Sequence, residues 1–197
     1  MTSDQNGIII IDKPAGITSA RVVSIVKKTL KAKKVGHAGT LDPFAEGVLI
    51  CCINQATRLA EFLLHGTKKY IAELKLGEET DTQDLTGTVI AAAELENYSI
   101  ETLQKVFKSF EGPLEQLPPV YSALKHKGVP LYKLARSGKP VQKPSRQVEI
   151  YSIAILDMAL PLIRFEVSCS AGTYIRTLGA DIGKTLGCGG HLNALKR

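Results

Sequence analysis

Apolar residues recur with two different periods along this chain, and segments of the two kinds are interspersed. Four consecutive isoleucines at 8–11 predict a buried strand, which turn-forming residues at 12–16 end. Apolar residues at helical spacing within 22–30 predict a helix that Thr18 or Ser19 caps. Strict alternation at 70–76 and at 163–170 predicts two strands, the first of which carries Tyr70 on its apolar face.

The remaining regular elements follow from the same two patterns. Helical spacing recurs at 59–63, 100–110 and 175–186, and apolar runs at 48–53 and 148–156 predict further strands. No regular strand–helix–strand repeat connects these elements, so we expect an α+β domain around a mixed sheet. The length of 197 residues fits one such domain.

Charge is unevenly distributed. The chain carries a net charge of +6, and the segment 112–147 alone holds seven basic residues against one acid. That segment also contains six prolines, so we expect a long surface excursion with one helical turn near 131–136. A second cluster of five lysines lies within 27–34. Two basic patches on a small domain indicate a polyanionic partner, although a solvated surface would give the same composition.

Several classes of protein are excluded or disfavoured. Purely aliphatic runs, such as residues 8–11, are far too short for a membrane span, and the first dozen residues lack a secretory pattern, so we expect a cytosolic protein without membrane contact. The four cysteines and four histidines have no metal-ligand spacing, and we expect reduced core thiols and no metal. Walker A, dinucleotide-binding, nucleophile-elbow and zinc-peptidase motifs are absent.

The segment 36–47 is the most unusual part of the sequence. It places His37 and Asp42 in a glycine-rich loop between two apolar elements, where an enzyme can hold polar groups against a substrate. The competing interpretation is structural, because Asp42 before a proline also suits an Asx turn.

Several motifs together carry a resemblance to one family. They are Gly7–Pro14, Val35–Pro43, Gly47–Leu49, Lys68–Tyr70, Gly77–Asp84, Pro118–Lys125, Cys169–Thr177 and Gly187–Leu195. In content and order the chain resembles the bacterial tRNA pseudouridine-55 synthases, the TruB family, over essentially its whole length. The resemblance implies a pseudouridine-synthase-like α+β fold on a mixed, mainly antiparallel sheet flanked by helices and loops.

The resemblance also implies a reaction. One uridine in the T-loop of tRNA becomes pseudouridine: the C1′–N1 bond breaks, the uracil rotates, and C5 joins C1′. The implied partner is the T-arm of tRNA, and neither cofactor nor metal is needed. A base that is modified in this way must leave its stack. Attack by an aspartate at C1′, attack on the uracil ring and a detached glycal intermediate are all compatible with the sequence.

Three residues take catalytic roles by motif position. Asp42 matches the essential aspartate, and Arg176 matches the guanidinium that favours its charged form. Arg176 lies off the apolar stripe of its helix, so we expect it to face a cleft. Tyr70 matches the residue that stacks on the target base, although an apolar strand face also suits a plain core tyrosine.

The resemblance assigns further residues to substrate binding. Tyr174 and Leu195 match positions that line the uracil pocket, and His37 matches one near the extruded nucleotide; simple packing is the alternative for each. Lys13 and Lys125 are expected to contact the RNA backbone, unless they are only solvated. The remaining charged positions, expected behind the groups that touch substrate, are Arg58 and Asp84.

We therefore expect residues 1–197 to form a pseudouridine synthase catalytic domain with a basic RNA-binding excursion at about 112–147. The family's C-terminal RNA-binding domain is expected to be absent, and the protein to be a monomer. One alternative is a catalytically weak T-loop-binding module or tRNA-folding helper, in which Asp42 is dispensable. Another is a hydrolase that pairs Asp42 with Glu46 or Asp84 and releases free uracil.

Overall fold

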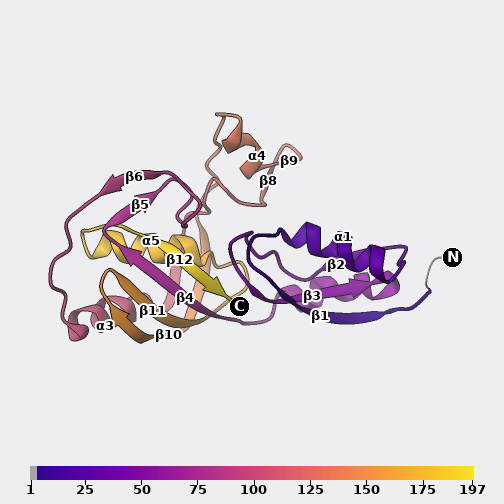
Figure 1. The fold of residues 1–197 in the computed structure, drawn as a ribbon, viewed down its shortest axis with the longest axis horizontal. Coiled ribbons are helices and arrows are strands. Elements are labelled where there is room, and N and C mark those ends of the chain that lie inside the picture. The colour runs from indigo at the N-terminus through magenta and orange to yellow at the C-terminus, as the bar shows by residue number, and fades with distance from the viewer. Residues whose placement is uncertain (1–3) are drawn as a thin grey trace. The chain divides into compact units, whose positions relative to one another are not determined.

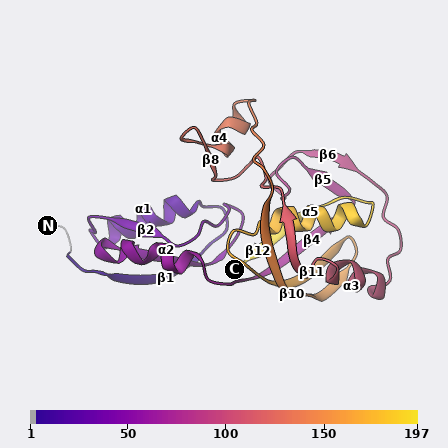
Figure 2. The same cartoon turned by 180° about the vertical axis from the view of Figure 1, so that it is seen from behind.

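The computed structural model describes residues 4–197 and divides the chain into two compact units. The first unit extends to Lys68 and includes Leu195–Arg197, and the second comprises Lys69–Ala194. Among the described residues, no helix is long and apolar enough to cross a membrane. Figures 1 and 2 label most of the elements of each unit.

The first unit is built on a three-stranded antiparallel sheet in the order β1–β3–β2. Its elements are β1 (Gly7–Lys13), α1 (Ser19–Thr29), β2 (Val35–His37), β3 (Gly47–Ile53), the 3-10 helix η1 (Asn54–Leu59) and α2 (Ala60–Leu64). Thr18 caps α1 by accepting a hydrogen bond from the backbone N–H of Arg21 at 3.1 Å. Val22 and Val26 of α1 pack against Leu49 on β3, which confirms the helical stripe.

The isoleucine run of β1 is only half buried. Ile9 and Ile11 pack against the core of the first unit, whereas Ile8 is 46% and Ile10 67% exposed. The prediction of a fully buried strand is wrong here, because the sheet is covered by α1 on one face and strand side chains alternate between faces.

The second unit contains a five-stranded sheet in the order β12–β4–β11–β10–β7. These strands are β4 (Lys68–Leu76), β7 (Gly112–Gln116), β10 (Arg146–Ala159), β11 (Leu162–Cys169) and β12 (Gly190–Lys196). β10 pairs antiparallel with both β7 and β11. With the helices α3 (Ile100–Lys108) and α5 (Ile175–Thr185), this sheet confirms the predicted α+β class with mainly antiparallel strands.

Aromatic and aliphatic side chains fill the core of the second unit. Phe107 of α3 meets Phe165 of β11 edge to face, with ring centroids 5.3 Å apart. α5 approaches the start of β12 so closely that a Cβ on Gly183 would lie 2.4 Å from the carbonyl carbon of Gly189. Glycine is therefore required at position 183 for this packing.

Two small hairpins complete the second unit. β5 (Glu78–Thr80) pairs with β6 (Val89–Ala92), and β8 (Lys125–His126) pairs with β9 (Val129–Pro130) before α4 (Leu131–Arg136). The helical turn expected at 131–136 is confirmed. The basic excursion is shorter than expected, because residues 112–116 form an edge strand of the sheet and 146 begins β10.

All four cysteines are buried and free, as their spacing predicts. Burial raises the pKa of the Cys51 and Cys52 thiols, which keeps both protonated and unreactive.

Candidate active site

Asp42 lies in the first unit, on the loop that connects β2 to β3. Hydrogen bonds hold the residues of this loop on either side of Asp42. The Ser19 hydroxyl donates to the carbonyl of Leu41 at 3.0 Å, and the Leu41 N–H donates back to it at 2.9 Å. On the other side, the carbonyl of Pro43 accepts from the N–H of Gly16 at 2.8 Å. The backbone around the half-buried Asp42 is therefore held in one conformation.

A buried lysine supports the same loop. Lys13 is 0% exposed, and its ammonium donates to the carbonyls of Pro14 at 2.9 Å, Ile17 at 2.8 Å and Pro43 at 3.2 Å. Three acceptors match the three N–H donors of an ammonium group. The expected contact of Lys13 with an RNA phosphate is wrong, because the side chain has no exposed surface and its donors are occupied.

Lys13 also brings a positive charge to the Asp42 loop. Burial lowers the pKa of Lys13, while the negative charges of Asp42 and Glu46 oppose that shift. The Lys13 ammonium and the Asp42 carboxylate therefore attract each other electrostatically. Glu46 itself is exposed, and its carboxylate lies 4.0 Å from the ammonium of Lys196.

The last residues of the chain close the far end of the loop. The carbonyl of Leu195 accepts from the Glu46 N–H at 2.9 Å, and the Arg197 guanidinium donates to the carbonyls of Val48 and Gly39. Leu195 is buried, at 6% exposure.

His37 ends β2 and is half-buried. Burial and the nearby Arg197 charge lower the pKa of His37, which keeps its ring neutral at pH 7. Its Nδ1 is buried and has no hydrogen-bond partner within residues 4–197. The predicted contacts of His37 and Leu195 with the nucleotide stay predictions.

In the second unit, Arg176 and Asp84 form a buried ion pair. Their side chains are 3% and 6% exposed, and Arg176 Nη1 lies 3.6 Å from Asp84 Oδ2. The guanidinium also donates to the carbonyls of Thr82 at 2.7 Å and Tyr121 at 2.8 Å. The other oxygen, Asp84 Oδ1, accepts from the Thr82 hydroxyl and from the N–H and hydroxyl of Thr86.

The environment of Arg176 in this cluster differs from the one that the sequence predicts. The side chain does lie off the apolar stripe of α5, but it is buried rather than open to a cleft as we expected. Its hydrogen bonds join the segment around Thr82 to the Tyr121 segment at the base of the basic excursion. Asp84 contacts Arg176 and fits a supporting position; a direct role for either residue in catalysis stays a prediction.

Tyr174 is oriented by two residues that the sequence analysis did not single out for this role. Gln116 of β7 accepts from the Tyr174 N–H at 2.7 Å and donates to its carbonyl at 2.9 Å. The Arg146 guanidinium lies over the Tyr174 ring, 4.5 Å from its centroid, and also donates to the carbonyl of Gly172. No local pattern marks Gln116, because its partner is 58 residues away.

The remaining predicted residues are distributed over both units. Tyr70 is buried on β4, at 9% exposure. Lys125 is exposed on β8, where it is accessible to a polyanion. Arg58 is exposed on η1 and lines a surface pocket of the first unit.

Comparison with known proteins places the chain in a family. Residues 27–175 match the model of the TruB family pseudouridylate synthases (N terminal domain). Over 192 residues the chain is 50% identical to tRNA pseudouridine synthase B of Geobacter sulfurreducens, and over 193 residues it is 48% identical to that of Francisella philomiragia. These matches cover 98% of this chain in each case. The chain therefore belongs to the TruB family of pseudouridylate synthases.

Solved structures agree with this assignment. A Cbf5–Nop10–Gar1 complex contains a chain that matches all of this one with a TM-score of 0.74 and 31% identity, over 54% of that chain. An H/ACA RNP bound to a substrate RNA containing 2′-deoxyuridine gives a TM-score of 0.71 and 32% identity, over 97% of this chain and 46% of that one. The present chain spans 63–64% of the two curated relatives.

Proposed function

We propose that this chain isomerises uridine 55 in the T-loop of tRNA to pseudouridine. The C1′–N1 bond breaks, the uracil turns, and a C1′–C5 bond forms. The proton that leaves C5 is balanced by one that N1 gains, so the reaction needs no oxidant, reductant or cofactor. The observation that supports the proposal most is the position of Asp42, which lies on a loop that hydrogen bonds hold in place beside the buried Lys13 ammonium.

The fixed loop suits the chemistry. A carboxylate that attacks the sugar or the ring, or that stabilises a developing positive charge at C1′, must be ionised and held in place. The Lys13 ammonium supplies a positive charge without exposing it to the substrate. Asp42 can thus remain ionised next to RNA phosphates, whose negative field would otherwise favour its protonated form.

The proposal assigns supporting roles to residues of the second unit. Tyr70 provides an aromatic face for the flipped uracil and takes part in removing the C5 proton. By motif position, Arg176 is the guanidinium that favours the charged form of the catalytic aspartate. Tyr174 lines the base pocket, and Arg146 and Gln116 fix its orientation.

RNA binding rests on exposed cations of the basic excursion, such as Lys125. If about five phosphates are neutralised, the logarithm of the binding constant falls against the logarithm of salt concentration with a slope of roughly −3.5. A binding constant that does not change with salt would contradict this electrostatic contribution.

The test maps pseudouridine in an unmodified tRNA transcript by carbodiimide-dependent reverse-transcription stops. The chain is compared with Asp42→Ala and with Glu46→Gln, which removes an exposed carboxylate from the same loop. We expect a T-loop stop with the unaltered chain and with Glu46→Gln, and none with Asp42→Ala. Retained tRNA binding without any stop would favour the binding-module alternative, and release of free uracil would favour the hydrolase.

A further inference from the structure

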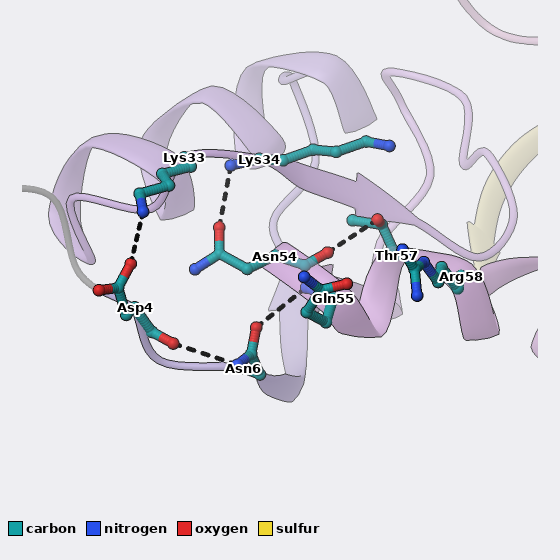
Figure 3. A pocket seen from close by; sticks show the side chains of 8 residues that line it. All are labelled: Asp4, Asn6, Lys33, Lys34, Asn54, Gln55, Thr57 and Arg58. Atoms are coloured by element: carbon teal, nitrogen blue, oxygen red, sulfur yellow. Dashed lines mark hydrogen bonds and ion pairs between the residues drawn. The ribbon is translucent and has the colours of Figure 1, made fainter.

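A pocket of about 490 Å³ opens on the surface of the first unit (Figure 3). Three segments that are distant in sequence line it: the chain before β1, the turn after α1, and η1. Hydrogen bonds join these segments. Asn54 accepts from the Lys34 N–H at 3.0 Å, and Asn6 accepts from the Gln55 N–H at 3.0 Å. Hydrogen bonds from backbone N–H groups to the Asn54 and Asn6 side chains therefore hold the three segments together around the pocket.

The charges around this pocket are predominantly positive. Lys33, Lys34 and Arg58 contribute three cations, and Asp4 contributes the one carboxylate. The Lys33 ammonium pairs with Asp4 Oδ1 at 2.6 Å, as Figure 3 shows. Within residues 4–197, neither the Lys34 ammonium nor the Arg58 guanidinium has an ion pair or a hydrogen bond. Among residues 4–197, two of the three cations that line the pocket thus have no counter-ion.

We propose that this pocket binds phosphates of the tRNA backbone, and that Asp4 occupies the phosphate position beside Lys33 until RNA displaces it. The proposal rests on the proposed function, which supplies the RNA. The Lys33 ammonium lies at one end of the pocket, and the Lys34 ammonium and the Arg58 guanidinium lie toward the other (Figure 3), so they provide donors for more than one phosphate of a backbone segment. The side-chain amide of Gln55, which also lines the pocket, supplies a further donor.

The Lys33–Asp4 pair is suited to displacement. Both side chains are largely exposed, 61% for Lys33 and 83% for Asp4. Exposed ion pairs contribute little to stability, so exchange of one anion for another costs little. Hydrogen bonding and attraction to Lys33 lower the pKa of Asp4, so Asp4 is an anion at neutral pH and competes with phosphate. Removal of its charge should therefore tighten RNA binding.

The first test measures tRNA binding at about 0.1 M salt with matched substitutions. Asp4→Asn removes the competing anion, and its control Glu61→Gln removes an exposed carboxylate from α2 of the same unit. Lys34→Ala removes a free pocket cation, and its control Lys105→Ala removes an exposed lysine from α3. We expect Asp4→Asn to tighten binding about threefold and Lys34→Ala to weaken it about fivefold with a loss of roughly 0.7–0.9 from the salt slope.

The controls decide the interpretation. If Glu61→Gln tightens binding as much as Asp4→Asn, or Lys105→Ala weakens it as much as Lys34→Ala, the effect is one of total charge and the proposal is wrong. Pseudouridine formation by the unaltered chain is measured separately. Its absence, together with the expected binding changes, would reject the proposed function and retain the phosphate pocket.

A second measurement needs no RNA. Titration with inorganic phosphate is followed by the amide NMR signals of the ¹⁵N-labelled protein. We expect saturable shifts at Lys34 and Gln55 that appear at lower phosphate concentration in Asp4→Asn. Shifts spread evenly over exposed basic residues, with no difference between the two proteins, would overturn the proposal.

Discussion

Replacement of Lys13 by methionine tests whether a buried ammonium organises the Asp42 loop. Methionine retains an unbranched side chain of similar length but has no donors. The carbonyls of Pro14, Ile17 and Pro43 would then lose the ammonium contacts at 2.9, 2.8 and 3.2 Å.

The expected loss follows from two opposing contributions. A hydrogen bond to a charged group contributes about 1.5–3 kcal/mol, and three are lost at once. The cost of burying the ammonium, several kcal/mol, disappears with it and offsets part of that loss. We expect the free energy of unfolding to fall by about 3 kcal/mol.

Urea unfolding of the unaltered chain and of Lys13→Met measures this change. Lys33→Met is the matched control, since the Lys33 side chain is 61% exposed and its loss should change stability by less than about 0.5 kcal/mol. Equal stability of Lys13→Met and the unaltered chain would refute the reasoning. A folded Lys13→Met variant is also expected to form pseudouridine more slowly, because the loop loses one of the two hydrogen bonds that hold it at Pro43.

Three further outcomes are expected. Asp84→Asn leaves the buried Arg176 guanidinium without its counter-ion and should lower the free energy of unfolding by about 3–5 kcal/mol, measured by urea unfolding. Arg146→Ala removes the cation over the Tyr174 ring, and should raise KM for tRNA more than it lowers kcat, whereas equal changes would contradict an orienting role. The pKa of His37 is lowered in the folded chain, so its contribution to stability is present above the unfolded pKa of about 6.5 and is lost as pH falls through the folded pKa. NMR titration of the His37 ring measures the folded pKa. Unfolding at pH 7 and pH 5, with and without His37→Asn, measures the loss of stability.

The sequence predicts the elements better than their environments. Alternation and helical spacing are local patterns, so the strands at 70–76 and 163–170 and the helix that Thr18 caps were predictable. The sequence could not show which of the isoleucines at 8–11 are buried and which are exposed, because four identical apolar residues show no alternation. Its alternating burial depends on the core that α1 and β3 form against one face of β1.

In the candidate site, too, the sequence identifies residues better than it predicts their environments. Asp42 could be identified from its motif. Its loop, however, is supported by Lys13, and a lysine is expected at the surface because of its charge. Lys13 is buried because carbonyls from its own turn and from Pro43, 30 residues further on, surround its ammonium. Gln116 and Arg146 were missed as orienting residues for the same reason: their contacts with Tyr174 form only in the folded chain.

The central claim is that Asp42 drives transfer of the uracil from N1 to C5, and release of the C5 hydrogen measures it most directly. A tRNA transcript made with uridines tritiated at C5 is incubated with saturating chain, with Asp42→Asn and with Glu46→Gln. The account predicts release of one tritium per tRNA by the unaltered chain and by Glu46→Gln, and none by Asp42→Asn that still binds tRNA. Release by Asp42→Asn at the unaltered rate, or no release by a folded, tRNA-bound unaltered chain, would contradict it.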